Sequence, residues 1–100
     1  MVGSHEAIHV YRILQETLNN VVRHSKSSTA WVRLKITPHH LRLEVEDRGI
    51  GVPDDAAGGL GLIAMRERAD ILQGKLEMQR PAEGGTLVIL EMPLAQAATV

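Results

Sequence analysis

Apolar and polar residues alternate with two different periods along the chain, and each change of period marks a change of secondary structure. From His5 to Ser25 apolar residues recur every three or four positions, which predicts one long amphipathic helix with Ser4 as its N-cap. The period shortens to two over residues 29–37 and again over 41–47, which predicts two strands joined by a tight turn. The first half is therefore expected to form a helix followed by an antiparallel hairpin.

The second half of the chain repeats this order. Residues 60–72 have helical spacing, and Gly74 is placed to end that helix. Residues 75–79 and 86–92 are typical of two strands, joined by a turn rich in proline and glycine. The expected fold is a two-layer α/β (α+β) sandwich, in which a mixed, mainly antiparallel sheet carries both helices on one face.

The alternation also assigns strand residues to the two faces of the sheet. One set is aliphatic and is expected to point toward the helices: Ala30, Val32, Leu34, Ile36, Leu41, Leu43 and Val45. The other set is expected to face water: Trp31, Arg33, Lys35, Arg42 and Glu44. The domain is expected to span residues 8–93, with residues 1–7 as an extension that includes the helix start and residues 94–100 as a tail.

Composition narrows the class of protein. At 100 residues, 44% of them apolar, the chain has the size of one small domain. It has one Trp, one Tyr and no Phe, so the core is expected to be aliphatic. The formal net charge of -1 argues against nucleic acid and acidic membranes as partners. The chain has no cysteine, which excludes disulfides and thiolate metal sites and fits a reducing compartment. No apolar run approaches the roughly 18 residues of a membrane span.

Glycines are concentrated just before the second helix. The stretch from Glu46 to Leu62 holds five of the nine glycines, and Asp47 precedes the first of them. A glycine-rich segment that runs into a helix start exposes backbone N–H groups at the positive end of the helix dipole, where a phosphate binds well. The alternative is a flexible connection between a strand and a helix. The spacing matches neither the Walker P-loop nor the G-x-G-x-x-G dinucleotide pattern.

Four polar residues share one stripe of the first helix, at positions i, i+4, i+8 and i+11. They are Arg12, Glu16, Asn20 and Arg23. Asparagine is a poor residue for a helix interior, and a carboxylate one turn before a carboxamide provides the hard oxygen ligands that Mg²⁺ prefers. The alternative is that the stripe is simply the solvated side of an amphipathic helix.

Four segments occur in a fixed order along the chain: QETLNNVVRHS, DRGIGVP, GGLGLIAMRERADILQGKL and GGTLVILEMP. In this order and spacing they resemble the ATP-binding catalytic domain of two-component sensor histidine kinases, in the superfamily shared with DNA gyrase, the heat-shock ATPase chaperone and MutL. The first and third segments look most like the nitrate/nitrite and membrane-fluidity sensor branch. The resemblance covers about Ile8 to Pro93 and implies the Bergerat-type ATP-binding fold, with ATP and Mg²⁺ as ligands.

The resemblance implies roles for residues at the end of the first helix. Asn20 matches the asparagine that holds Mg²⁺ between the nucleotide phosphates. Glu16, one turn earlier, matches the catalytic acid that positions or activates the attacking group. Arg23 falls where a basic residue reaches the phosphates, and His24 and Lys26 follow near the nucleotide.

Further roles are implied for the glycine-rich segment and the last strand. Asp47 matches the acid that accepts the exocyclic amine of adenine, which a guanine oxo group would not satisfy. Thr86 matches the threonine that backs the adenine, and Gly49 and Gly51 let the backbone pass under the base. Backbone amides at the start of the second helix are implied to bind the phosphates, namely those of Gly59, Leu60, Gly61 and Leu62.

The resemblance also implies partners. By the resemblance, residues 52–58 match a lid segment that is longer in most of the superfamily, and no helix pair with a phosphoacceptor histidine is seen in this sequence. The expected partners are therefore ATP or ADP, a dimerisation and phosphoacceptor domain, and a response regulator. The isolated domain is expected to be monomeric, without contact to nucleic acid or membrane, and to belong to the cytoplasmic part of a bacterial-type sensor. Two alternatives are a stand-alone anti-sigma-factor-type serine kinase and a non-catalytic nucleotide-binding module.

Overall fold

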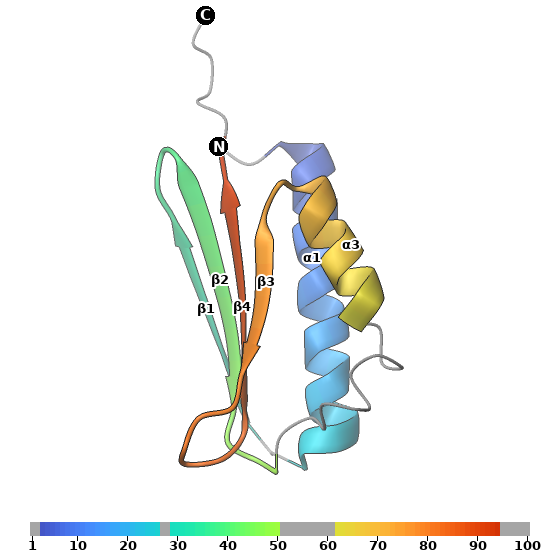
Figure 1. Cartoon of the computed structure of the whole chain (residues 1–100), viewed down its shortest axis with the longest axis vertical. Helices are drawn as coiled ribbons and strands as arrows, with labels where there is room; N and C mark the ends of the chain where they lie inside the picture. Colours follow the sequence, from blue (N-terminus) through green and yellow to red (C-terminus); the bar gives the residue numbers. More distant parts are fainter. Residues whose placement is uncertain (1–2, 27–28, 51–61, 95–100) are drawn as a thin grey trace, which may run out of the picture.

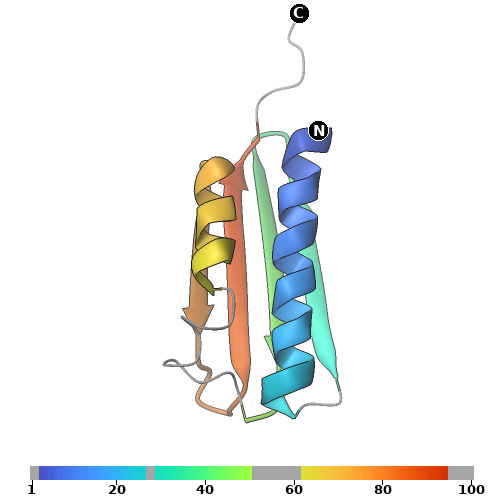
Figure 2. The same ribbon diagram turned by 90° about the vertical axis from the view of Figure 1, so that its right-hand side faces the viewer.

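Two helices cover one face of a four-stranded sheet in the computed structural model, which describes residues 3–26, 29–50 and 62–94 (Figure 1). The elements in order are α1 (Ser4–Asn20), η1 (Val21–Ser25), β1 (Ala30–Ile36), β2 (His40–Asp47), α3 (Leu62–Ile71), β3 (Lys75–Gln79) and β4 (Thr86–Pro93). Figure 2 shows α1 and α3 side by side in front of the strands. The expected two-layer sandwich is confirmed.

The sheet has the strand order β1-β2-β4-β3, and each neighbouring pair in it is antiparallel. The expected sheet was mixed but mainly antiparallel, and no parallel pair occurs among the described strands. The central strands β2 and β4 contribute Leu41, Leu43 and Leu90 to the core that the helices cover. The fold thus places the end of β2 and the start of β4 together beneath the helices, where Asp47 pairs with Thr86.

The apolar side of β1 departs from the prediction. Val32, Leu34 and Ile36 lie opposite buried residues of β2, yet they remain 46%, 56% and 50% exposed. The core cluster draws residues from α1, α3, β2 and β4 but none from β1. Because the helices pack against each other above the two central strands, β1 is left as an edge strand whose core-side residues are only half covered.

Helix α1 differs from the predicted helix at both ends. Its N-cap is Gly3 and not Ser4, because Gly3 has the extended backbone (φ -69°, ψ 161°) and its carbonyl accepts a hydrogen bond from the N–H of Ala7 at 2.8 Å. The α-helix ends at Asn20 and continues as one π-helical turn, η1, which the left-handed Lys26 follows (φ 57°). A π turn is wider than an α-helical turn, and Arg23 within it is exposed whereas Asn20 before it is buried.

The connection from α3 to β3 also differs from the prediction. Gly74 was expected to end the helix, but α3 ends at Ile71, and Gln73 is the residue in the left-handed conformation (φ 56°). Gly74 is required for another reason, since a Cβ at this position would lie 2.5 Å from the carbonyl oxygen of Glu91. At the same end of the sheet, Leu94 is buried and its N–H donates to the carbonyl of His39 at 2.8 Å, so the packed part of the domain includes Leu94.

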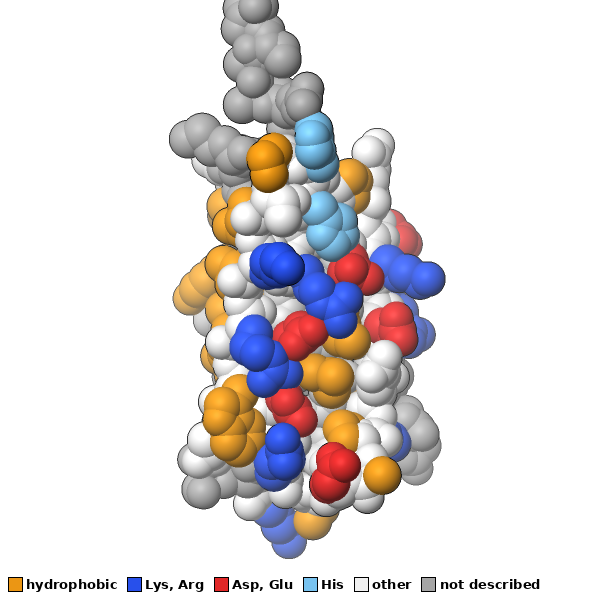
Figure 3. Space-filling model, turned by 90° about the vertical axis from the view of Figure 1, so that its left-hand side faces the viewer, with side chains coloured by type: hydrophobic (Ala, Val, Ile, Leu, Met, Phe, Trp, Pro, Cys, Tyr) orange, Lys and Arg blue, Asp and Glu red, His pale blue; other side chains and the backbone are white. Residues whose placement is uncertain are grey.

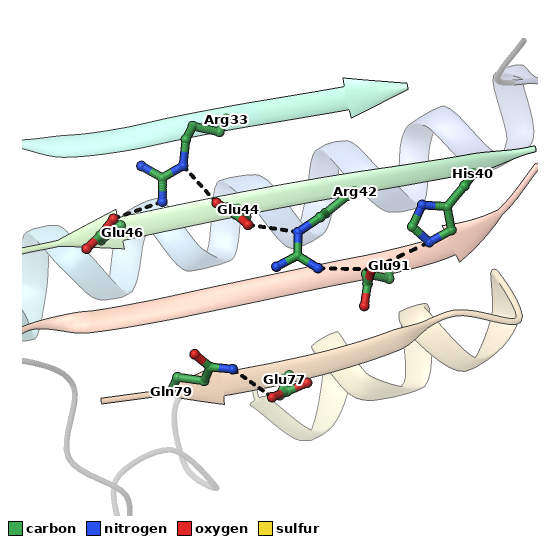
Figure 4. Close-up of polar contacts among 8 residues, drawn as sticks. All are labelled: Arg33, His40, Arg42, Glu44, Glu46, Glu77, Gln79 and Glu91. Carbon is green, nitrogen blue, oxygen red and sulfur yellow. Dashed lines mark hydrogen bonds and ion pairs between the residues drawn. The ribbon is translucent and has the colours of Figure 1, made fainter. Parts of the chain in front are cut away.

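The opposite face of the sheet carries charged residues and faces water, as predicted, and these residues form a ladder of ion pairs (Figures 3 and 4). Arg33 contacts Glu44 at 2.7 Å and Glu46 at 2.8 Å, and Arg42 contacts Glu44 at 2.8 Å and Glu91 at 3.0 Å. Hydrogen bonds from Arg33 and then Arg42 lower the pKa of Glu44, and a hydrogen bond from Arg33 lowers the pKa of Glu46. The two glutamates therefore contribute stability that depends on their being ionised.

Replacing Glu44 by glutamine is expected to flatten the loss of stability in acid. A carboxylate whose pKa is lowered in the folded state stabilises the fold above its ordinary pKa of about 4.3, and that contribution is lost as the pH falls through the lower folded value. Glu44→Gln should therefore be less stable than the wild type at pH 7, with a gap that narrows in acid. Urea unfolding at several pH values measures this.

The matched control is Glu77→Gln, because Glu77 lies on β3 and accepts a hydrogen bond from Gln79. It is not among the glutamates of the arginine ladder, so its pH profile should follow that of the wild type. Parallel stability curves for the wild type and Glu44→Gln would contradict the assigned role of the ladder.

Candidate nucleotide-binding site

A cavity lies between the helices and the sheet, where β2 ends and β4 begins. Its lining comes from the helical elements and three strands: Thr17, Asn20, Val21, Val45, Asp47, Met65, Met78, Thr86 and Val88. Three of the site residues expected from the sequence are in this set, namely Asn20, Asp47 and Thr86. Chain segments far apart in sequence thus meet in one hollow that is lined by both polar and apolar side chains.

Asp47 is the dominant polar group of the cavity. It is 0% exposed, because the alternation of β2 turns it to the same side as Val45. Its Oδ1 accepts a hydrogen bond from the N–H of Gly49 at 2.9 Å. Its Oδ2 is buried and accepts no hydrogen bond from the residues that the structure describes. A buried carboxylate oxygen without a donor is costly, so this atom could accept a hydrogen bond from an N–H group that enters the cavity.

The backbone of β4 approaches Asp47 closely at Gly85. Gly85 has φ 89°, and a Cβ there would lie 2.8 Å from the carbonyl carbon of Asp47 and nearer still to its oxygen. Gly84 also has a positive φ, of 101°, but its nearest neighbour is the carbonyl oxygen of Gly49 at 3.6 Å. Glycine at position 85 is therefore what lets β4 pass beside the acid and place Thr86 next to it.

The turn after Asp47 is anchored from the other face of the sheet. Arg48 lies above the ring of Trp31, 5.5 Å from its centroid, and its Nε contacts Glu46 at 3.2 Å. Residues 46 and 48 therefore contact the charged ladder while Asp47, between them, points into the cavity. This alternation fixes the direction of the buried carboxylate.

Helix α1 supplies the polar residues on the opposite side of the cavity. Asn20 and Thr17 are both buried, and Glu16 is half-buried one turn before Asn20. The hydroxyl of Thr17 donates to the carbonyl of Ile13 at 2.7 Å and lies 3.4 Å from the sulfur of Met65 in α3. The stripe predicted on this helix is thus not a solvated face at its C-terminal end, since it turns inward from the exposed Arg12 to the buried Asn20.

The basic residues expected near the phosphates follow directly on α1. Arg23 and Lys26 are exposed, at and just after the π turn η1. His24 belongs to the same turn. Leu62 is the first residue of α3. The other residues proposed to bind phosphates or base lie outside the described part of the chain, namely Gly51, Gly59, Leu60 and Gly61.

Several residues of the cavity were not singled out from the sequence as site residues. They are Thr17, Val21, Val45, Met65, Met78 and Val88. Val45 was expected on the core side of the sheet, and the packing of the helices over the sheet brings Met65 of α3 into the same cavity lining. Thr17 had a usable signal, since it lies three residues before Asn20 and therefore on the same side of the helix.

The lining indicates which ligand chemistry fits. Aliphatic and thioether walls suit a flat apolar ring, and the single buried carboxylate oxygen suits an amino group on the edge of that ring. Within the described ranges, no three His, Cys, Asp or Glu side chains come together as a metal site. No described helix is long and apolar enough to cross a membrane.

The comparisons with known proteins agree with this geometry. The family model described as "Histidine kinase-, DNA gyrase B-, and HSP90-like ATPase" matches residues 5–96. The nitrate/nitrite sensor protein NarX of Escherichia coli is 38% identical over 92 residues, which is 90% of this chain and 15% of NarX. The oxygen sensor histidine kinase NreB of Staphylococcus carnosus is 38% identical over 88 residues, which is 85% of this chain and 25% of NreB.

A solved structure has the same fold. The blue-light activated histidine kinase of Erythrobacter litoralis EL346 superposes with a TM-score of 0.74 and 28% sequence identity, over 90% of this chain and 33% of that one. The chain therefore spans a quarter or less of the two sensor proteins and a third of this kinase.

Proposed function

The chain belongs to the histidine kinase-, DNA gyrase B- and HSP90-like ATPase family, and from this we propose that it binds Mg-ATP and supplies the γ-phosphate to a histidine on another domain of a sensor kinase. Family membership and fold confirm the resemblance seen in the sequence, and ATP binding is the property that they support directly. The site residues, the magnesium ion and the phosphoryl transfer are parts of the proposal.

One observation carries the choice of nucleotide. The Oδ2 atom of Asp47 is a buried acceptor for which the described residues provide no donor. Adenine carries an exocyclic amino group at the edge of its ring, which can donate to this oxygen, whereas guanine has an oxo group at the same position that would be repelled. Thr86 lies beside Asp47 in the register of the sheet and is proposed to support the same edge of the base.

The phosphates are proposed to lie toward the end of α1 and the start of α3. Asn20 lines the cavity there, and Arg23 and Lys26 provide positive charge just beyond it. The first turn of α3 adds the positive end of a helix dipole. Glu16, one turn before Asn20, is proposed as the residue that positions or activates the attacking imidazole.

The oxygen donors present fit a magnesium ion that is held mainly by phosphates and water. Mg²⁺ binds through one or two protein oxygens when phosphates complete its shell, and the carboxamide of the buried Asn20 offers such an oxygen at the cavity. When bound, the ion would neutralise charge on the phosphates. The role of the chain's own residues is to orient the nucleotide and exclude water from it.

The phosphoacceptor is proposed to lie on a dimerisation domain. The part of this chain in the transfer would be positioning and charge neutralisation, on which transfer of this kind mainly depends. His24 is part of η1, next to the proposed phosphate region, and is not proposed as the acceptor. A response regulator is proposed as the next recipient of the phosphoryl group. A cytoplasmic location is part of the same proposal. No observation favours the anti-sigma-factor type of serine kinase or a non-catalytic module over this function.

Calorimetric titration of the chain with ATP and GTP, each with and without Mg²⁺, tests the proposal. We expect saturable binding of ATP that Mg²⁺ strengthens, and at least about tenfold weaker binding of GTP, because one repelled edge contact is worth about 1.4 kcal/mol or more. Asn20→Ala should remove the effect of Mg²⁺. A folded wild-type chain that binds neither nucleotide at millimolar concentration would refute the function. Equal binding of ATP by the wild type with and without Mg²⁺ would refute the role of Asn20.

A further inference from the structure

Two methionines line the cavity from different elements, Met65 from α3 and Met78 from β3. Met65 is 2% exposed, and its sulfur lies 3.4 Å from the hydroxyl of Thr17. Met78 is only partly buried, and it pairs with Val88 across the sheet. One methionine is therefore enclosed in the core, whereas the other packs against that core and is only partly covered.

The rest of the lining determines which groups can contact the faces of a bound ring, and the two methionines are among them. The cavity residues include no aromatic side chain, because Trp31 lies on the opposite face of the sheet and Tyr11 is exposed on α1. A flat ring held by Asp47 at its edge therefore has only aliphatic and thioether groups available for its faces. The thioether is the more polarisable of these, and its unbranched side chain adjusts to the ring that it covers.

We propose that Met78 is a specificity-determining residue of this site, a thioether wall that closes on the face of the bound purine while Met65 forms the fixed wall. The inference rests on the proposed nucleotide function and adds a contact that the polar residues do not provide. Asp47 selects the edge of the base, and Met78 selects a flat ring of purine size over phosphate alone. Met78 on β3 is thus the adjustable part of the pocket.

The chain is well suited to a direct test, because it has four methionines and only two aromatic residues. With ¹³C-methyl methionine, a bound purine should shift the methyl resonances of Met65 and Met78 through its ring current. Met92 is buried in the core cluster and does not line the cavity, so its resonance is the internal reference. We expect ADP with Mg²⁺ to shift Met65 and Met78, and tripolyphosphate with Mg²⁺ to leave both unchanged.

The outcomes separate this inference from the function on which it rests. Calorimetric binding of ADP without a shift of the Met78 methyl would overturn the inference and leave the proposed function standing. Absence of ADP binding would overturn both. Equal shifts with tripolyphosphate would also overturn the inference, since the change would then come from the phosphates and not from the base.

Variants extend the test to affinity. Met78→Ala is expected to weaken ADP binding roughly tenfold and leave tripolyphosphate binding unchanged, while Met78→Leu, which keeps the volume, should stay within about threefold of the wild type. Leu76→Ala is the matched control, because Leu76 is on the same strand and face but outside the cavity lining. An equal loss of ADP affinity in Leu76→Ala and Met78→Ala would mean that Met78 acts only through stability, which would overturn the inference.

Discussion

Replacing Asp47 by alanine is expected to weaken adenine-nucleotide binding roughly 100-fold or more while the domain stays folded. The side chain is fully buried, but one of its two oxygens accepts no hydrogen bond from the described residues. The carboxylate therefore destabilises the domain without nucleotide and contributes a hydrogen bond when nucleotide is bound. The variant loses the hydrogen bond to Gly49 and is relieved of the desolvation cost. Its stability should therefore change by no more than about 1 kcal/mol.

Calorimetry with ADP and thermal unfolding without nucleotide measure the two parts of this result. Asp47→Asn is the informative companion, because its single carbonyl oxygen can accept from Gly49 or from the ligand, but not from both. Its amide N–H group at the Oδ2 position would donate to an oxo group, so we expect a reduced preference for ATP over GTP. A folded Asp47→Ala variant with the affinity of the wild type would refute the assignment of this residue to adenine.

Replacing Gly85 by alanine is expected to impair both folding and binding. The added Cβ would collide with the backbone of Asp47, and the φ of 89° is unfavourable for an L-residue with a side chain. The ends of β2 and β4 would have to separate, which displaces the carboxylate of Asp47 and its neighbour Thr86. We expect a loss of about 2 kcal/mol or more in the free energy of unfolding, together with loss of nucleotide binding.

Gly84→Ala is the matched control for this prediction. Gly84 also has a positive φ, but an added Cβ there would come no closer than 3.6 Å to the carbonyl oxygen of Gly49, so the variant carries backbone strain without the collision. It should lose about 1 kcal/mol and retain most of its affinity. Urea unfolding and ADP titration of the two variants measure the difference. Similar behaviour of the two variants would show that close approach at Asp47 is not what requires glycine at position 85.

Local pattern was sufficient for the elements and for the side of the sheet to which several side chains point. The alternation over β2 correctly put Leu43 and Val45 on the core side, and the same count places Asp47 there. The change of period located both helices to within a few residues at each end. It failed at details set by single backbone conformations, such as the π turn after Asn20 and the left-handed Gln73.

By itself, then, the sequence determined the two-layer fold, the family and the residue types that the site needs, because these follow from periodicity and from motifs in a fixed order. The tertiary structure alone decided which residues share the cavity. It brought Met78 and Thr17 beside Asp47, left the core side of β1 half exposed, and buried the Oδ2 atom of Asp47 without a donor among the described residues. Burial and hydrogen-bond satisfaction depend on contacts between segments distant in the chain, and no local pattern encodes these contacts.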